Sequence, residues 1–177
     1  MARRVVIAAL LLAVVGGAAF AEVGVGLSVG YPLGPALVYD WGFEPDFLFV
    51  GAVARWKQGA FLLDTGVSGW LLSELRVMCL YLDLGACFDA GVFRFGIAGG
   101  IDVVRLSEPG YGSYSELGFN GKLNMDLKIG KVTVGLALLV PIDPLLAEEP
   151  GDRWTFLAAQ PTLNVLYWFG TSSSKLR

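Results

Sequence analysis

The sequence predicts an all-β protein, an antiparallel up-and-down β-barrel that spans a membrane with its strands. The chain of 177 residues is 55% hydrophobic, yet its only long apolar run lies at the N-terminus. Over most of the remaining chain, apolar residues alternate with small or polar ones at a period of two, which indicates strands whose two faces meet different surroundings. The connections between these segments are alternately short and long, as in transmembrane barrels.

The first 21 residues have the organisation of a secretory signal peptide. Arg3 and Arg4 precede an uninterrupted apolar stretch at residues 5–15, and Ala19-Phe20-Ala21 has the A-x-A form of a cleavage site. The stretch is too short to cross a hydrocarbon core of ~30 Å as a helix; the alternative is an uncleaved N-terminal anchor. We therefore expect a signal peptide at 1–21, a barrel at 22–169 and a polar C-terminal tail at 170–177.

The strands of the first half follow in chain order. Residues 22–31 alternate valine and leucine with glycine and serine, and a Pro-Leu-Gly-Pro break ends the segment. Residues 47–56 are apolar on both faces, so their length and flanks alone indicate a strand. Residues 61–70 and 75–88 return to strict alternation, with acidic residues confined to one face.

The strands of the second half are more clearly marked. Residues 91–105 alternate large apolar side chains with glycine, alanine and isolated charges. Residues 115–129 have the strongest pattern, because a helix would scatter their charges around its circumference whereas a strand collects them on one face. Residues 132–140 and 154–169 complete a set of eight.

The connections fix how the strands are oriented. Residues 57–59, 89–90 and 130–131 form tight turns, whereas the connections at 107–114 and 142–153 are long. Short turns are typical of the periplasmic side of such barrels, so we expect the N-terminus at the periplasmic rim. Residues 71–74 then form a further outer connection.

The strand count leaves one alternative open. Residues 36–42 also resemble a short strand, which would give an odd number, whereas single-chain bacterial barrels have even numbers. We expect eight membrane strands, with 36–42 extending the first outer hairpin. Ten strands, with one long segment split, is the alternative.

The apolar face is expected to meet lipid and the polar face to line the lumen. A soluble barrel of the lipocalin type has the opposite arrangement. Turning Lys122 toward the bilayer midplane would cost ~2–4 kcal/mol, and its polar neighbours on the same face would turn with it. Small and charged residues suit the narrow interior of an eight-stranded barrel, which side chains fill.

A network of charged side chains is therefore predicted inside the lumen. Its members are Asp64, Asp83, Arg94, Asp102, Glu116, Lys122, Asp126 and Lys128. Buried charges need partners, so the first interpretation is a structural network that fills the lumen and fixes strand register. The second is a narrow ion path or gate built on rings of charge.

Aromatic residues near the predicted strand ends indicate interfacial girdles. They are Tyr31, Trp41, Trp56, Trp70, Tyr114, Trp154, Tyr167 and Phe169. General enrichment of aromatics in strands would not by itself place them at the ends.

The mature chain resembles the small bacterial outer-membrane β-barrel proteins, the group that includes the OmpA and OmpX barrels. The final strand has apolar residues at alternate positions, Leu163, Val165, Tyr167 and Phe169, and is similar to the C-terminal signal read by the outer-membrane insertion machinery. The chain departs from the family pattern in the tail that follows Phe169. Residues 29–36 and 39–41 resemble uncharacterised members of the group. The resemblance implies an integral protein of the bacterial outer membrane, with lipid and the insertion machinery as partners, and it supplies no catalytic residue.

Composition argues against several other functions. The chain contains no histidine, which removes the commonest general base and metal ligand. Cys79 and Cys87 lie on one face of one predicted strand, ~26 Å apart, too far for a disulfide, and two cysteines without histidine cannot form a zinc site. The net charge of −3 gives no basic surface for nucleic acid. We expect no metal, no cofactor and a monomer.

The predicted outer loops are acidic. Their acidic residues are Asp40, Glu44, Asp46, Glu74, Glu108, Asp143, Glu148, Glu149 and Asp152. These residues either keep the surface soluble or hold divalent cations that bridge to a surface ligand. The sequence thus predicts a structural, adhesive or surface-interaction role for the barrel. A narrow porin-like channel is the alternative, and a histidine-free enzyme a more distant one.

Overall fold

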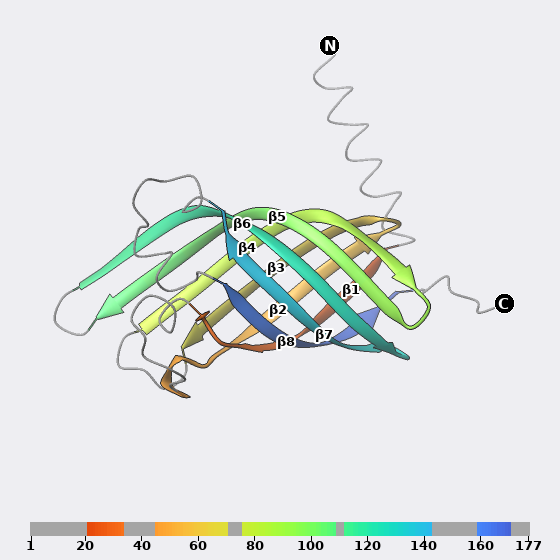
Figure 1. The fold of residues 1–177 in the computed structure, drawn as a ribbon, viewed down its shortest axis with the longest axis horizontal. Coiled ribbons are helices and arrows are strands. Elements are labelled where there is room, and N and C mark those ends of the chain that lie inside the picture. The colour runs from red at the N-terminus through yellow and green to blue at the C-terminus, as the bar shows by residue number, and fades with distance from the viewer. Residues whose placement is uncertain (1–20, 34–44, 71–75, 109–111, 143–158, 171–177) are drawn as a thin grey trace, which may run out of the picture.

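The computed structural model describes residues 21–33, 45–70, 76–108, 112–142 and 159–170. In this part of the chain, eight antiparallel strands close into a barrel in sequence order (Figure 1). The strands are β1 (Glu22–Gly30), β2 (Phe49–Gln58), β3 (Phe61–Trp70), β4 (Arg76–Ala90), β5 (Phe93–Glu108), β6 (Gly112–Ile129), β7 (Val132–Pro141) and β8 (Gln160–Phe169). A short 3-10 helix, η2 (Pro45–Phe47), precedes β2. The described residues contain no helix of the length and apolarity needed to cross a membrane.

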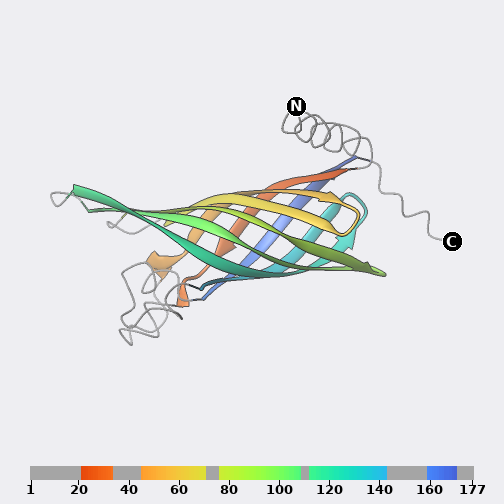
Figure 2. The same cartoon turned by 90° about the horizontal axis from the view of Figure 1, so that it is seen from above.

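Each strand pairs with the next, and β8 returns to β1. The closing pair runs from Val23 opposite Phe169 to Gly30 opposite Thr162, so the first and last strands lie side by side (Figure 2). The predictions of an up-and-down barrel and of eight strands are confirmed, and the alternative of ten is wrong. Residues 36–42, the candidate extension of the first hairpin, lie outside the described residues.

Tight turns gather at the end of the barrel where β1 begins and β8 ends, which we call the turn end. Gly59, Gly91 and Gly130 have φ of 59°, 62° and 63°, a left-handed conformation that glycine adopts without steric cost. The predicted turn at 130–131 is confirmed, whereas the turn predicted at 57–59 comes slightly later, between Gln58 and Phe61. The predicted turn at 89–90 is wrong, since β4 continues through Ala90 and the chain reverses after it.

Side chains are distributed as in a barrel that faces an apolar solvent. Large apolar residues of the outer face are exposed, with Leu27 at 70% and Leu117 at 66%, whereas Asp64 and Asp83 on the inner face are completely buried. A water-soluble protein has the reverse distribution. The soluble barrel with an apolar interior is therefore excluded.

Glycines on the inner face make room for the bulky groups inside. A Cβ atom at Gly24 would meet the Trp168 ring, one at Gly66 would meet Tyr81, and one at Gly135 would overlap the Asp126 carboxylate. Because a narrow barrel leaves little radial space, these three lumenal side chains are accommodated by the missing side chain of a glycine on the adjacent strand.

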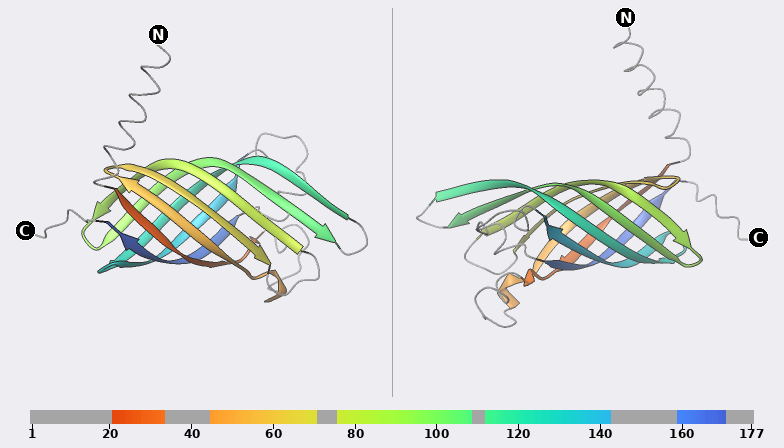
Figure 3. Two further views of the ribbon diagram at one scale, coloured as in Figure 1. Left: turned by 180° about the vertical axis from the view of Figure 1, so that it is seen from behind. Right: turned by 45° about the horizontal axis from the view of Figure 1, so that its top comes forward.

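The rim at the other end, which we call the loop end, is uneven. The hairpin of β5 and β6 projects furthest (Figure 3). Pairing between β6 and β7 begins only at Asn120 opposite Pro141, with one further bond from Ile142 N to Phe119 O, so the β6 residues before Phe119 pair with β5 alone.

Candidate functional site: the charged lumen

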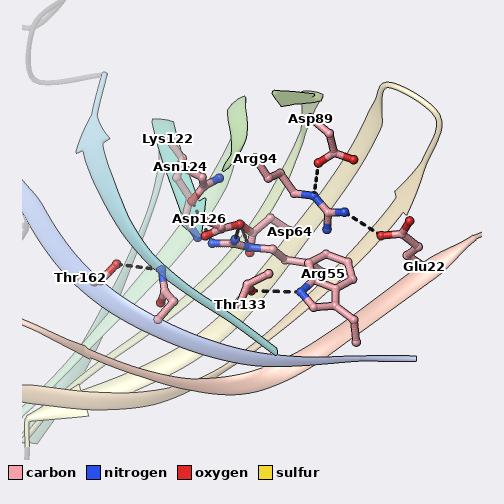
Figure 4. Close-up of polar contacts among 12 residues, drawn as sticks. Glu22, Arg55, Asp64, Asp89, Arg94, Lys122, Asn124, Asp126, Thr133 and Thr162 are labelled. Carbon is pink, nitrogen blue, oxygen red and sulfur yellow. Dashed lines mark hydrogen bonds and ion pairs between the residues drawn. The ribbon is translucent and has the colours of Figure 1, made fainter. Parts of the chain in front are cut away.

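Arg55 of β2 is the centre of the polar lumen. Its Nε donates to Asp64 Oδ2 at 2.8 Å, Nη1 to Asp126 Oδ2 at 2.6 Å, and Nη2 to Asn124 Oδ1 at 2.9 Å (Figure 4). Its side chain is 1% exposed. Bonds between a buried guanidinium and carboxylates are short and strong, and the planar fork matches them in geometry.

These contacts cross the bore. The eight strands close in sequence order, so β2 and β6 are four strands apart in both directions and form opposite walls. Arg55 on β2 reaches Asn124 and Asp126 on β6. The lumen at this level is occupied by a side chain that ties one wall to the other.

Lys122 of β6 adds a second cation at this level. Its Nζ lies 3.2 Å from Asp64 Oδ2 and 3.8 Å from the centre of the Tyr81 ring. The Tyr81 hydroxyl donates to Asp64 Oδ1 at 3.2 Å. We call Arg55, Asp64, Lys122, Asn124 and Asp126 the middle cluster.

Arg94 of β5 forms a second crossing near the turn end. Its Nη2 donates to Glu22 Oε2 at 2.7 Å, and its Nε donates to Asp89 Oδ1 at 2.8 Å. Glu22 belongs to β1, which stands opposite β5 in the barrel. The Arg94 guanidinium also lies 4.3 Å from the Trp168 ring centre, and Trp168 Nε1 donates to Thr133 Oγ1 at 3.0 Å.

Two lysines complete this second group. Lys57 Nζ lies 3.3 Å from Asp89 Oδ2, and Lys128 Nζ lies 3.4 Å from Asp89 Oδ1. The Asp89 side chain is 33% exposed, so water screens these pairs. We call Glu22, Lys57, Asp89, Arg94 and Lys128 the turn-end cluster.

An apolar cluster lies inside the barrel toward the loop end. Val77 and Cys79 of β4 pack with Val104 and Leu106 of β5, and Trp70 of β3 packs against them. We call these five residues the apolar plug. Trp70, expected in an interfacial girdle, instead faces inward, because it has the same alternation as Asp64 and Ser68; that expectation is wrong.

The structure brings together some of the predicted lumenal residues and separates others. Asp64, Lys122 and Asp126 meet in the middle cluster, whereas Arg94 and Lys128 belong to the turn-end cluster. The remaining predicted members occupy other positions. Asp83 is buried opposite Asp64 in the β3–β4 register, Asp102 is buried opposite Tyr81, and Glu116 lies on the part of β6 that projects past β7.

Several residues of these clusters were missing from the prediction, and Arg55 is the most important. Its segment is apolar on both faces, so no polar face drew attention to it. A signal was nevertheless present, since an arginine in a membrane strand is costly toward lipid and must face inward. Glu22, Lys57, Asp89 and Trp168 were missed as well.

The other predicted residues lie as follows. Cys79 and Cys87 are buried free thiols. Trp56 packs edge-on against Phe61 with ring centres 5.5 Å apart, and Tyr167 packs against Phe169 at 4.9 Å; both pairs lie near the turn end. The remaining aromatics and acids are placed only in part: Tyr31 follows β1 at the loop end and Tyr114 lies on the projecting part of β6, but Trp41, Trp154 and most acidic loop residues lie outside the described residues.

Chemically, both clusters are suited to holding walls together. Most of their charges lie in pairs that join different strands, and the described residues contain no group of three or more potential ligands that could hold a metal ion. Charge pairs of this kind fix the relative height of the strands they join, because a slip in register would leave a buried charge without its partner.

Comparison with known proteins supports the fold. No protein-family model matches the chain, and no curated protein sequence matches it. Among solved structures, the chain is similar to the N-terminal β-barrel domain of Pseudomonas aeruginosa OprF, with a TM-score of 0.57 and 9% sequence identity. The match covers 84% of this chain and 97% of that domain. At this identity the likeness concerns the fold, and it agrees with the small eight-stranded barrel that the sequence predicted.

Proposed function

We propose that this chain is an integral protein of the bacterial outer membrane, with a lumen closed by side chains and a structural or surface-interaction role. The observation that carries the proposal is the inverted distribution of residues. Apolar side chains cover the outer face, and ion pairs lie inside. This arrangement is stable where lipid surrounds the barrel.

The apolar outer face supports the membrane assignment in detail. The outward residues of β7 and β8 are all apolar over the length of these strands. The outward hydroxyl of Thr65 donates to the backbone carbonyl of Tyr81 at 2.7 Å, which satisfies a polar group that lipid cannot. The predicted signal peptide at 1–21 supplies the route of export.

A closed lumen follows from the three levels inside the barrel. The turn-end cluster and the middle cluster each place an arginine across the bore, and the apolar plug lies beyond them on the inner faces of β3, β4 and β5. An ion on this path would have to displace two crossing ion pairs and then pass an apolar section, and hydrophobic constrictions exclude hydrated ions.

A narrow channel is the second candidate function, favoured by the charged side chains that continue from the turn end to the middle of the lumen. Single-channel recording of the purified, refolded chain in planar bilayers distinguishes a closed barrel from a narrow channel. We expect no defined conductance steps from the wild type. Defined steps that change in Arg55→Ala and Arg94→Leu, but not in the lipid-facing control Leu136→Ala, would favour the channel.

The membrane assignment has its own test. A transmembrane barrel kept folded in detergent migrates differently on a gel before and after boiling, so we expect heat-modifiable migration. The predicted connection at 107–114 is shorter than expected, since β5 runs to Glu108 and β6 begins at Gly112. Protease added to intact cells should therefore cut within 109–111 and 142–153 and spare the tight turns. Identical migration of boiled and unboiled samples would contradict the proposal.

A further inference from the structure

Two arginines interrupt the apolar outer face. Among the strand residues whose side chains the structure describes, Arg76 of β4 and Arg105 of β5 are the only charged ones that alternate with the outward apolar set. Both side chains are exposed. The remaining charged strand residues alternate with the lumenal set, so these two need a separate explanation.

The two arginines are neighbours on adjacent strands. Arg76 is opposite Ser107 and Met78 is opposite Arg105, so the arginines form a diagonal pair with their Cα atoms ~7–8 Å apart. Neither forms an ion pair with an acidic side chain of the described residues. Both charges add to the positive potential of this part of the outer face, which attracts an anion.

Their position marks the edge of the apolar band. The next outward residues toward the turn end are Met78 on β4 and Val103 on β5. A cationic side chain on the lipid face is costly at the midplane, and the cost falls toward zero at the interface. The pair therefore belongs at the level of the lipid headgroups, at the loop end.

The immediate surroundings suit a phosphate group. Arg105 Nη2 donates to Ser113 Oγ of β6 at 3.3 Å, which directs the guanidinium along the outer face toward β6. Ser107 and Ser115 have the same outward alternation and offer hydroxyl donors. A guanidinium binds phosphate oxygens through two parallel hydrogen bonds.

We propose that Arg76 and Arg105 bind the phosphate of an anionic lipid headgroup in the leaflet at the loop end. The inference rests on the proposed membrane function and names a lipid class for that surface. If the turn end is periplasmic, this leaflet is the outer one, so the ligand is a phosphorylated glycolipid of the cell surface.

The full chain, folded in detergent, is reconstituted into phosphatidylcholine nanodiscs containing a bis-phosphorylated glycolipid, and bound lipid is counted by native mass spectrometry. Arg76→Gln with Arg105→Gln should weaken glycolipid binding about 25-fold, about fivefold for each arginine near an anionic surface. The double variant Arg76→Lys with Arg105→Lys should bind the glycolipid more weakly than the wild type and more tightly than the double glutamine variant. Lys131→Gln, which removes one exposed charge at the turn end, should bind as the wild type does.

Three outcomes would overturn the inference. The first is a loss of glycolipid binding in Lys131→Gln that equals the loss in Arg76→Gln or in Arg105→Gln made singly. It would indicate that net charge alone attracts the lipid. Another is complete displacement by millimolar inorganic phosphate, which would indicate a free-anion site. The third is unchanged binding in the double glutamine variant while heat-modifiable migration persists; the membrane proposal would then survive without the lipid site. A wild-type chain that fails to insert into bilayers would instead refute both proposals.

Discussion

The middle and turn-end clusters use the same chemistry in different surroundings. In each, an arginine crosses the bore to a carboxylate on the opposite wall. In the middle cluster, Arg55, Asp64 and Asp126 have side chains at most 1% exposed, whereas Glu22 and Asp89 at the turn end are 14% and 33% exposed.

The difference teaches that a contact of similar length can have very different consequences. A buried pair lost on one side leaves an uncompensated charge that water cannot reach, and the penalty is large. A pair near the mouth is screened by water and salt, so its loss is mild. We therefore expect a larger loss in the free energy of unfolding when a contact of the middle cluster is removed than when one of the turn-end cluster is removed.

Arg55→Met should lower the free energy of unfolding more than any other variant considered. Asp64 and Asp126 would each lose a bond to the guanidinium while staying buried, so the free energy of unfolding should fall by ~3–5 kcal/mol. Urea unfolding of the protein refolded into lipid vesicles, followed by gel migration, measures this. The variant that also carries Asp126→Asn should recover most of the loss, because Asp64 keeps Lys122 as its partner. A loss under ~1 kcal/mol in Arg55→Met would contradict the assigned role of this arginine.

Gly135→Ala should cause the next largest loss in the free energy of unfolding. The added methyl would overlap the Asp126 carboxylate, and overpacking of this kind costs ~1–3 kcal/mol. The matched control is Gly121→Ala on the outer face, where the nearest atom is a flexible end of Ile142 at 3.4 Å. We expect the control to stay within ~0.5 kcal/mol of the wild type; equal losses in both variants would point to strand propensity instead.

Glu22→Gln should lower the free energy of unfolding by ~1 kcal/mol, since Arg94 keeps Asp89 as a partner and the site is partly screened. The loss should shrink in 1 M salt, where the screening length is ~3 Å. The loss in Arg55→Met should not shrink, because salt does not reach the middle cluster. Equal salt sensitivity of the two variants would remove the distinction between the clusters.

Lys128→Gln should have the smallest effect, ~0.5 kcal/mol or less. Lys128 contributes a single contact of 3.4 Å to Asp89, which keeps Arg94 and Lys57 as partners. The same vesicle unfolding assay measures it. A loss as large as that of Glu22→Gln would show that the lysines of the turn-end cluster stabilise the barrel more than their exposure suggests.

Alternation in the sequence predicted which way the clearest residues point. Asp64, Lys122 and Asp126 lie in segments with strict period-two patterns, and all three face the lumen. The same alternation already placed Trp70 on the face of Asp64, so its inward position was readable, although its place at a strand end suggested a girdle.

Contacts across the bore could not be read in the same way. Alternation gives the face of a residue but not its height along the barrel axis, which depends on the stagger of the strands. Arg55 and Asp126 meet only once all eight strands have closed with their observed registers. Arg55 was hidden further because Phe49 and Val53, inward residues that precede it on β2, are apolar.

The two crossings also bear on how the barrel assembles. They join residues 71 and 72 positions apart in the chain, whereas the hairpins between them bring together close neighbours. Long-range contacts of this kind reward the chain only after costly loop closure, so we expect them to form after the folding transition state. Interactions formed that late slow unfolding and leave the folding rate almost unchanged. Arg55 and Arg94 would then act as kinetic locks, which set how long a completed barrel stays closed and have little influence on how fast it inserts.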